Sequence, residues 1–442
     1  MKTLLAALVA ALALAAPAVA QTPPPETLFR NVRVFDGTGA PLSAPTDVLV
    51  RGNVIAAIGS GAAAPGATVI EGGGRTLMPG LIDAHTHIMF STLPQAALLT
   101  ADIGFVSIAA ARAAEDMLMR GFTSARDLGG PVFGLKQAID AGLATGPRIW
   151  PSGAFISQTG GHGDFRLPNE LPAAPGNFGY ADRIGAAAIA DDATMVRTRA
   201  REQLALGATQ IKLMAGGGVS SSYDPLDVTQ YTEAELRAGV EAAENWGTYV
   251  TVHAYTPRAV RQALAAGVRC IDHGNMLDDA TAKLMADKGV WWSLQPFTDD
   301  GSDSRFAEGS PNRIKQLTMY AGTDTAYALA RKYRIKTAWG TDILFSAAAA
   351  RGQGQLLAKM VKWYTPAEAL TIATSGNAAL LALSGPRNPY PGRLGVVATG
   401  ALADLILVEG DPTQDLALVA DAAKNFVVIM KDGKVYKNTV SR

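Results

Sequence analysis

The sequence predicts an α/β fold: a (β/α)8 TIM barrel with a small β-sandwich domain built from both chain termini. Three observations predict this fold. Strand-like and helix-like segments alternate between about Gly80 and Leu383, β-like runs punctuated by glycine occur at both chain ends, and all five histidines lie at or just beyond predicted strand ends. A chain of 442 residues is long enough for one barrel with an appended domain.

Eight strand-like runs occupy the middle of the chain, as a TIM barrel requires. They are "LIDAHTHI", "FTSARDLG", "RIWPSGAFIS", "QIKLMAGG", "YVTVHAY", "CIDHGN", "WWSLQPF" and "KTAWGTD". The intervening segments carry helix signals, such as a capping box of Thr232 and Glu235 that is closed by Gly247. Pro257 and Gly267 delimit the next helix. A doubly wound open sheet is the alternative architecture.

The runs at the two chain ends predict one β-sandwich domain in two parts, residues 21–79 and 389–442, which flank a barrel over residues 80–388. The N-terminal runs are "TLFRNVRVFDG", "TDVLVRGNVIAAIGSG" and "TVIEGGGRTLMPG", and the C-terminal runs are "GRLGVVATGALADLILVEGDP" and "NFVVIMKDGKVYKN".

Residues 1–20, "MKTLLAALVAALALAAPAVA", have the composition of a cleavable signal peptide. Lys2 precedes a long apolar core, and Ala-Val-Ala forms a small-x-small site before Gln21. We expect a periplasmic or secreted protein that is not held at a membrane after cleavage. An uncleaved anchor is the alternative, because the run approaches the ~20 residues that a membrane span needs. Cys270 is the only cysteine, which excludes an internal disulfide.

Charge is balanced, with 39 basic and 39 acidic residues. No overall field therefore attracts the protein to nucleic acid or to an anionic membrane. We expect a small molecule as its partner and no nucleic acid. A homo-oligomer is compatible with the sequence.

Two histidines share one face of the first predicted barrel strand. His85 and His87 are two residues apart, as are Asp83 and His85, and side chains at this spacing point the same way in a strand. Buried imidazoles between strand and helix would lack hydrogen-bond partners. The interior of the barrel at its C-terminal rim is the better place for them.

The other three histidines follow the same rule. His253 and His273 lie near the ends of the fifth and sixth strands, and His162 lies in the glycine-rich loop after the third. Each alone could be structural, but five at one rim predict a shared site. Imidazole clusters of this density typically bind transition metals.

Lys212 and Asp342 complete the predicted site. Lys212 lies within an apolar strand, where burial favours the neutral amine. A neutral amine can react with carbon dioxide to form a carbamate, an anion able to bridge two cations. The alternative is a lysine that extends to solvent from the strand end. Asp342 ends the eighth strand, where an aspartate often caps a helix instead.

This pattern of His-x-His, Lys, His, His and Asp on strands 1, 4, 5, 6 and 8 resembles the binuclear amidohydrolase superfamily. The resemblance covers nearly the whole mature chain, because "GLIDAHTHI", "GRLGVVATGALADLILVEGDP" and "TPAEALTIATSGNAALL" also match. Within it, "TGGHGD" and "VHAYT" are similar to the imidazolonepropionase-like group that includes metal-dependent Xaa-Pro dipeptidases and ochratoxin A amidohydrolases.

The resemblance implies two Zn2+ per chain, bridged by N6-carboxylated Lys212 and a hydroxide that acts as the nucleophile. One zinc would be held by His85, His87 and Asp342, the other by His253 and His273. Asp342 would take the proton of the hydroxide and return it to the leaving nitrogen.

Three further residues receive expected roles. The resemblance implies that His162 contacts the substrate or its developing oxyanion. Tyr255 shares the inward face with His253, so it either holds a substrate carboxylate or packs in the core. Asp127 points inward at the end of the second strand, where we expect a supporting role. The long loops after strands 3, 4 and 7 overhang the site and are expected to govern substrate choice.

The resemblance therefore implies hydrolysis of an amide bond to an α-amino acid, as in a dipeptide, an N-acyl amino acid or ochratoxin A. A cyclic-amide hydrolase of the imidazolonepropionase type, or a deaminase, is the alternative within the superfamily, but such sites commonly use one metal and do not need Lys212. A metal-free binding barrel and a periplasmic solute-binding protein are the non-enzymatic alternatives. Neither accounts for the complete set of six ligand-type residues.

Overall fold

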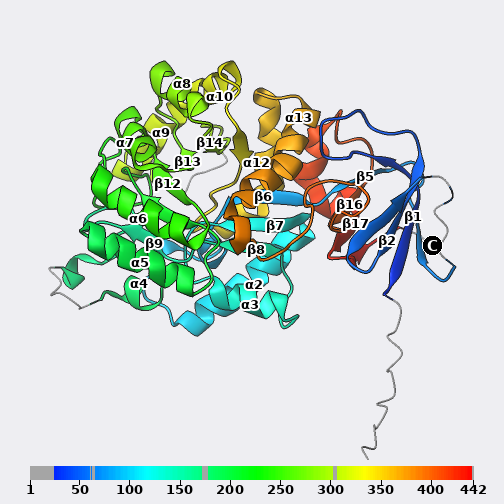
Figure 1. Cartoon of the computed structure of the whole chain (residues 1–442), viewed down its shortest axis with the longest axis horizontal. Helices are drawn as coiled ribbons and strands as arrows, with labels where there is room; N and C mark the ends of the chain where they lie inside the picture. The colour runs from blue at the N-terminus through cyan, green and yellow to red at the C-terminus, as the bar shows by residue number, and fades with distance from the viewer. Residues whose placement is uncertain (1–23, 60, 62–64, 172–177, 302–305, 441–442) are drawn as a thin grey trace, which may run out of the picture.

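The computed structural model describes residues 24–59, 61, 65–171, 178–301 and 306–440. The predicted signal peptide lies outside these residues. The chain forms two parts that lie side by side, a large barrel surrounded by helices and a sheet in which the first and last segments of the chain meet (Figure 1).

The barrel is a (β/α)8 barrel of parallel strands, as predicted. Its strands are β6 (Leu81–Thr86), β7 (Phe122–Asp127), β8 (Arg148–Pro151), β9 (Phe155–Ser157), β11 (Ile211–Met214), β12 (Val250–Ala254), β13 (Cys270–His273), β14 (Trp291–Leu294) and β15 (Thr337–Trp339).

The third strand differs from its predicted form. The run "RIWPSGAFIS" is divided into β8, which pairs with β7, and β9, which pairs with β11. The break lies at Gly153, whose φ of 75° is left-handed and disfavours any residue with a Cβ. An additional strand that was not predicted, β10 (Ala187–Ile189), pairs with β9.

The helices follow the predicted alternation and cover the outside of the barrel (Figure 1). The predicted capping box is confirmed, because Thr232 and Glu235 bond reciprocally at the start of α6, and Gly247 closes this helix in a left-handed conformation. The helices are α1 (Gln95–Leu98), α2 (Ile103–Met119), α3 (Phe133–Asp140), α4 (Tyr180–Arg183), α5 (Ala193–Ala205), α6 (Glu233–Trp246), α7 (Pro257–Ala266), α8 (Asp279–Asp287), α9 (Pro311–Ala321), α10 (Thr323–Lys332), α11 (Ala347–Arg351), α12 (Gln353–Ala358), α13 (Pro366–Thr371), α14 (Asn377–Leu381) and α15 (Ala422–Asn425). None of the helices in the described residues combines the length and apolarity of a membrane span.

The barrel is closed between its first and last strands by one buried side chain. Asn377 accepts a hydrogen bond from the backbone N–H of Trp339 at 3.0 Å and donates to the carbonyls of Ile82 and Trp339 at 2.7 and 2.8 Å. Asn377 follows a five-residue π-helical turn, Ile372–Gly376, which interrupts the predicted final helix. The amide thus satisfies backbone groups that would otherwise be buried without partners.

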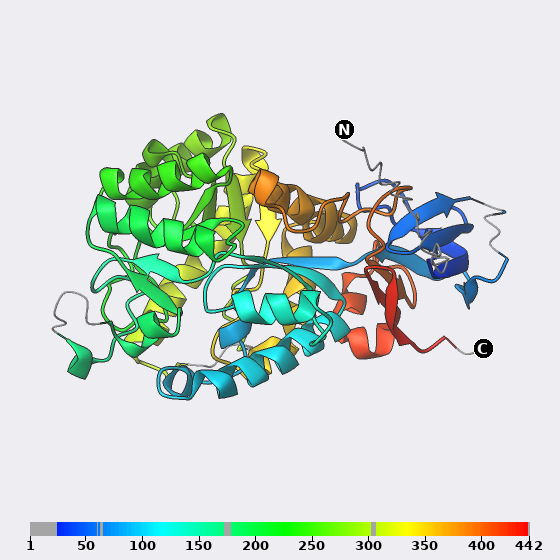
Figure 2. The same cartoon turned by 60° about the horizontal axis from the view of Figure 1, so that its bottom comes forward.

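The terminal sheet contains strands from both ends of the chain, drawn in blue and red (Figure 2). Their order is β18-β17-β16-β5-β1-β2-β3, with β4 also paired to β1. Its strands are β1 (Glu26–Val34), β2 (Thr46–Arg51), β3 (Val54–Ile58), β4 (Thr68–Glu71), β5 (Thr76–Pro79), β16 (Leu405–Val408), β17 (Phe426–Lys431) and β18 (Lys434–Asn438). One buried apolar cluster, with members from β1, β2, β5, β16 and β17, forms the core of this part.

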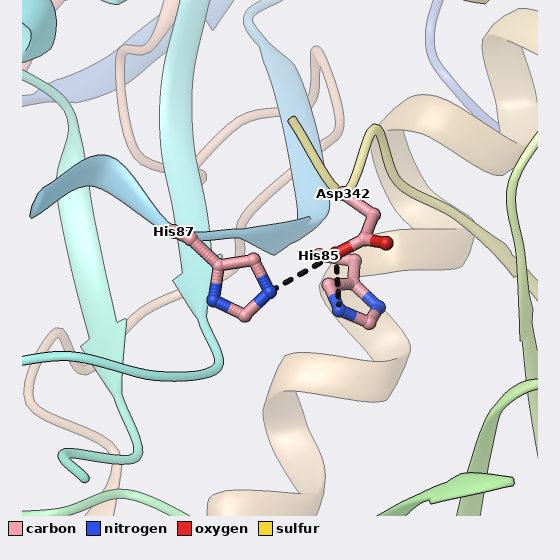
Figure 3. A group of neighbouring side chains, drawn as sticks. All are labelled: His85, His87 and Asp342. Atoms are coloured by element: carbon pink, nitrogen blue, oxygen red, sulfur yellow. Dashed lines mark hydrogen bonds and ion pairs between the residues drawn. The ribbon is translucent and has the colours of Figure 1, made fainter. Parts of the chain in front are cut away.

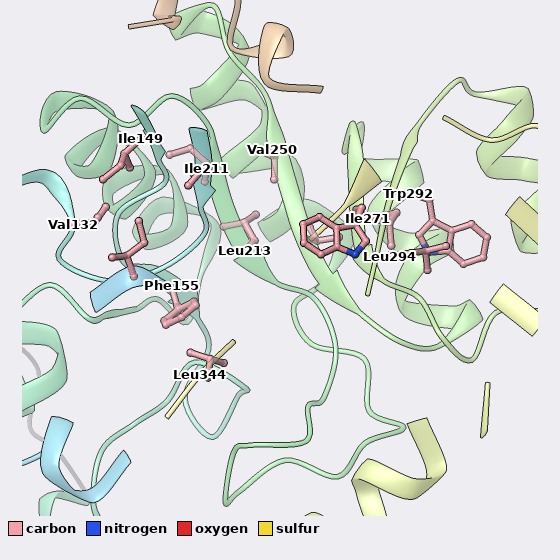
Figure 4. Packing of buried hydrophobic residues seen from close by; sticks show 14 of the residues in the cluster. Val132, Ile149, Phe155, Ile211, Leu213, Val250, Ile271, Trp292, Leu294 and Leu344 are labelled. Carbon is pink, nitrogen blue, oxygen red and sulfur yellow. The ribbon is translucent and has the colours of Figure 1, made fainter. Parts of the chain in front are cut away.

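The two parts share β16. Leu405 and Leu407 belong to the core of the terminal sheet, whereas Ile406 and Val408 belong to the large cluster of the barrel. This alternation is the period of two expected for a strand that is buried on both faces. Figure 4 shows part of the barrel cluster, with side chains from β11, β13 and β14.

Candidate active site

The structure brings all the predicted site residues into one cavity at the C-terminal ends of the barrel strands. The cavity has a volume of about 40 Å³. Its lining includes His85, His87, His162, Lys212, His253, Tyr255, His273 and Asp342. Because these residues come from five strands or strand ends and a loop, only the closed barrel places them together.

The most compact group in the cavity consists of His85, His87 and Asp342, whose ligand atoms all lie within 4.8 Å of one another. Asp342 Oδ1 is 3.3 Å from His85 Nε2 and 3.0 Å from His87 Nε2 (Figure 3). Both histidines are buried. Burial raises the pKa of Asp342, but the neighbouring His85 and His87 outweigh it, so this pKa is well below its usual value.

Two residues of the cavity adopt a strained backbone. His273 has a φ of 76° and Asp342 a φ of 51°, a region that residues other than glycine seldom occupy. Alternation along β13 turns Asp272 inward and would turn His273 toward the helices. The left-handed turn brings the imidazole back to the cavity. At Asp342, the backbone N–H donates to the carbonyl of His85 at 2.8 Å, which holds the turn in place.

Hydrogen bonds determine which ring nitrogens face the cavity. His253 Nε2 donates to the carbonyl of Gly217 at 3.0 Å, and His273 Nδ1 donates to Gln295 Oε1 at 2.7 Å. Burial lowers the pKa of both rings, that of His273 to about 3, so both are neutral. A neutral ring that donates from one nitrogen presents a lone pair at the other. This is the usual arrangement of a metal-binding histidine.

The contact between His87 and Asp342 indicates where a cation fits. His87 Nδ1 lies 3.5 Å from the carbonyl of Gly129, which can only accept. Burial lowers the pKa of His87 despite the opposing charge of Asp342. Its Nε2 lies 3.0 Å from Asp342 Oδ1, so a neutral His87 donates either to Gly129 or to Asp342, depending on the tautomer. With the proton on Nδ1, the Nε2 lone pair and the carboxylate oxygen can hold a cation together, and a histidine–carboxylate set is one that zinc accepts.

A buried ion-pair network holds the side chain of Lys212. Lys212 Nζ donates to Asp272 Oδ2 at 2.5 Å, and Arg126 Nη2 donates to Asp272 Oδ1 at 2.8 Å. Arg126 also donates to the carbonyl of Ala84 and to the hydroxyl of Tyr249. Burial lowers the pKa of Lys212, although the charge of Asp272 opposes the change. The amine is therefore closer to its neutral, reactive form than a lysine in water.

His162 and Tyr255 flank His253. The ring of His162 stacks on that of His253, with centroids 4.1 Å apart, and Tyr255 meets His253 edge-on at 4.9 Å. His162 Nδ1 lies 2.8 Å from Ser221 Oγ, on the loop after β11. Tyr255 is buried and packs with Val219. Both side chains thus line the cavity beside His253.

Sequence reasoning missed four polar residues that support the site. Asp272 and Arg126 hold Lys212, as described above, and Gln295 orients His273. Asp83, recognised only as sharing a face with His85, accepts hydrogen bonds from the backbone of His85 and from the N–H and hydroxyl groups of Thr341. The only signal in the sequence that could have identified Asp272 was the alternation of side chains along the strand "CIDHGN", which places Asp272 on the inward face.

The comparisons with known proteins assign the chain to a family. The model of the amidohydrolase family matches residues 76–440. The chain belongs to the amidohydrolase family. It is a hydrolase of amide or peptide bonds, as the resemblance implied, and this family is generally metal-dependent, in agreement with the His85, His87 and Asp342 group.

Three relatives of this amidohydrolase cover most of its length. An ochratoxinase from Aspergillus niger is 31% identical over 383 residues, which are 82% of this chain and 75% of that protein. A solved prolidase complexed with N-methylphosphonate-L-proline is 35% identical, with a TM-score of 0.86 over 94% of this chain and 100% of that one. A Xaa-Pro dipeptidase with methionine bound in its active site is 28% identical, with a TM-score of 0.80 over 93% of this chain and 100% of that one.

Asp127 supports the site from the end of β7. Its Oδ2 accepts a hydrogen bond from the backbone N–H of Ile88 at 2.7 Å, directly after His87. Burial raises the pKa of Asp127 to about 7, and the hydrogen bonds from Ile88 and Gly129 offset only part of this effect. These contacts are those of a residue that supports the backbone beside His87.

The raised pKa of Asp127 predicts a pH dependence of stability. The folded protein binds this proton more tightly than the unfolded chain, so the contribution is complete below about pH 4 and is lost as pH rises through about 7. Asp127→Asn cannot titrate. The free energy of unfolding of the wild type, measured in urea, should therefore fall relative to Asp127→Asn by up to about 1.4 kcal/mol per pH unit across this range. Parallel pH profiles of the two proteins would contradict the assignment.

Proposed function

We propose that this amidohydrolase uses two zinc ions to cleave the amide bond between an acyl group and an α-amino acid that carries a free carboxylate. Dipeptides, N-acyl amino acids and amides of the ochratoxin A type are the proposed substrates. The observation that carries the proposal is the convergence of four histidines, Lys212 and Asp342 on one buried cavity, together with the neutral rings whose lone pairs face it.

In the proposed site, His85, His87 and Asp342 hold one zinc and His253 and His273 hold the other, with carboxylated Lys212 between them. Two cations held there would lower the pKa of a bound water toward neutrality and polarise the scissile carbonyl. A carbamate on Lys212 would keep one N–H that could still donate to Asp272. Asp272 and Arg126 would then hold the nitrogen of the modified side chain.

Asp342 is the proposed carrier of the proton. Its low pKa makes it a carboxylate in the resting enzyme, so it can accept a proton from the attacking water. Collapse of the tetrahedral carbon breaks the C–N bond, and Asp342 returns the proton to the leaving nitrogen. Without that proton the amine would have to leave as an unstable anion.

His162 and Tyr255 are the proposed substrate-binding residues. His162, stacked on His253, lies where it can contact the carbonyl oxygen of the substrate. Tyr255 can hold the α-carboxylate of the leaving amino acid through its hydroxyl. The ochratoxinase and the prolidase among the relatives support an amide substrate with an amino-acid leaving group. The buried, ion-paired Lys212 disfavours the alternative of a one-metal cyclic-amide hydrolase or deaminase.

Elemental analysis of active protein should find about two zinc ions per chain, and Lys212→Ala should abolish turnover of a dipeptide. A short-chain carboxylic acid should restore part of the activity of Lys212→Ala, because it can supply the missing bridging carboxylate. Lys212→Arg is the matched control: it keeps the positive charge, leaves no space for the acid and should not be rescued. Full activity with one metal, or with an unmodified Lys212 amine, would contradict the binuclear scheme.

Tyr255→Phe should lower kcat/KM by about one to two orders of magnitude for substrates whose leaving amino acid has a free carboxylate. A hydrogen bond to a charged group contributes roughly 1.5–3 kcal/mol. The corresponding amino-acid amides carry no anion and should lose much less. Equal losses on the two substrate series would remove Tyr255 from carboxylate recognition.

We also propose that residues 1–20 direct export of the protein to the periplasm or beyond and are removed by cleavage between Ala20 and Gln21. N-terminal sequencing of the exported protein should begin at Gln21. A sequence beginning at Met1 would indicate a form that keeps its apolar N-terminal segment.

A further inference from the structure

A second cavity adjoins the cavity of the proposed metal site, called the metal cavity below, on the far side of Asp342. Its volume is about 90 Å³, several times the roughly 10–15 Å³ that one water molecule needs. Three residues line both cavities, Asp342, Phe297 and Tyr320. The remaining lining residues come from the ends of β14 and β15 and from the segment of α11 and α12: Pro296, Thr298, Thr341, Ile343, Ala348, Ala349, Gly352, Gln355, Leu356 and Lys359.

Asp342 lines both cavities. Its contacts with His85 and His87 use Oδ1, and the other carboxylate oxygen points away from His87 (Figure 3). The side chain of Asp342 is 17% exposed, whereas those of His85 and His87 are 1% and 3% exposed. A carboxylate placed in this way can exchange a proton with a group that stands at the boundary of the two cavities.

We propose that the cavity beside Asp342 binds the side chain of the leaving amino acid and selects apolar side chains of the size of leucine or phenylalanine. This inference rests on the proposed function. If Asp342 returns a proton to the leaving nitrogen, that nitrogen and its α-carbon stand beside Asp342. The side chain on the α-carbon then enters the space that opens there.

The chemistry of the lining selects apolar groups. Phe297, Ile343 and Leu356 provide apolar walls, and the small side chain of Ala349 leaves the space open. Lys359 also lines the cavity, but its Nζ is paired with Asp300 at 2.7 Å. A charged side chain would lose its hydration on entry. Burial of an apolar side chain instead removes its surface from water.

The position of Tyr255 is consistent with this orientation. Tyr255 belongs to the same apolar cluster as Phe297 and Tyr320, which line both cavities. An amino acid whose nitrogen lies at Asp342 can therefore direct its carboxylate to Tyr255 and its side chain past Phe297. Phe155 and Leu344, which line only the metal cavity, remain for the acyl group.

The test uses the full-length zinc-loaded enzyme and three substrates with one acyl group, N-acetylglycine, N-acetylleucine and N-acetylphenylalanine. Ala349→Phe fills the cavity, and Leu356→Ala enlarges it. Ala347→Phe is the matched control, because Ala347 lies on the same short helix, is exposed and does not line the cavity.

Ala349→Phe should lower kcat/KM for N-acetylleucine and N-acetylphenylalanine at least about tenfold. It should change kcat/KM for N-acetylglycine less than about twofold. Ala347→Phe should leave all three values unchanged. Leu356→Ala should raise the ratio of phenylalanine to leucine turnover. Equal losses by Ala349→Phe on all three substrates would overturn the inference.

Binding of the free amino acids separates the inference from the proposed function. By calorimetry, phenylalanine should bind the wild-type enzyme at least about tenfold more tightly than glycine, and Ala349→Phe should remove this preference while Ala347→Phe retains it. Absence of the preference in the wild type would overturn the subsite. If the preference is present but no acyl amino acid is hydrolysed, the subsite stands and the proposed reaction is wrong.

Discussion

The ion pair between Arg126 and Asp272 is the interaction on which the interior of this barrel depends. Both side chains are fully buried, and an unpaired charge at this depth would cost several kcal/mol. Arg126 joins β7 to the carbonyl of Ala84 in β6, and Asp272 joins β13 to Lys212 in β11. One network therefore neutralises the barrel interior and also orients the lysine that the proposed metal centre needs.

Above this network, the barrel presents groups whose protonation is controlled by burial. Burial lowers the pKa of His87, His253 and His273, which leaves lone pairs rather than protons in the cavity. Burial raises the pKa of Asp342, but the nearby His85 and His87 hold this pKa well below its usual value, so Asp342 stays ionised. The cavity thus offers neutral nitrogen and anionic oxygen donors, which is a suitable environment for a divalent cation and an unsuitable one for a charged amine.

The strained backbone at His273 and Asp342 shows that regular alternation along the strands does not place every side chain of the site. A regular strand would turn either Asp272 or His273 into the barrel. The left-handed conformation of His273 lets both side chains point into the barrel. Asp272 lies below the cavity and holds Lys212, and His273 lies at the wall of the cavity. At the barrel closure, Asp83 and the carbonyl of His85 hold the backbone around Asp342. Backbone strain of this kind persists only where surrounding contacts support it.

The sequence by itself determined the (β/α)8 barrel, the sheet built from both termini and the amidohydrolase resemblance, because each depends on local periodicity, capping residues or the spacing of a few histidines. His85 and His87 could be placed on one inward face for the same reason, although their role as ligands stays a prediction. Only the tertiary structure decided that the third strand breaks at Gly153, that Asp272 and Arg126 hold Lys212, and that a second cavity opens beside Asp342. These features arise from contacts between strands and helices far apart in the chain, where hydrogen bonds and packing, and not local sequence, select the conformation.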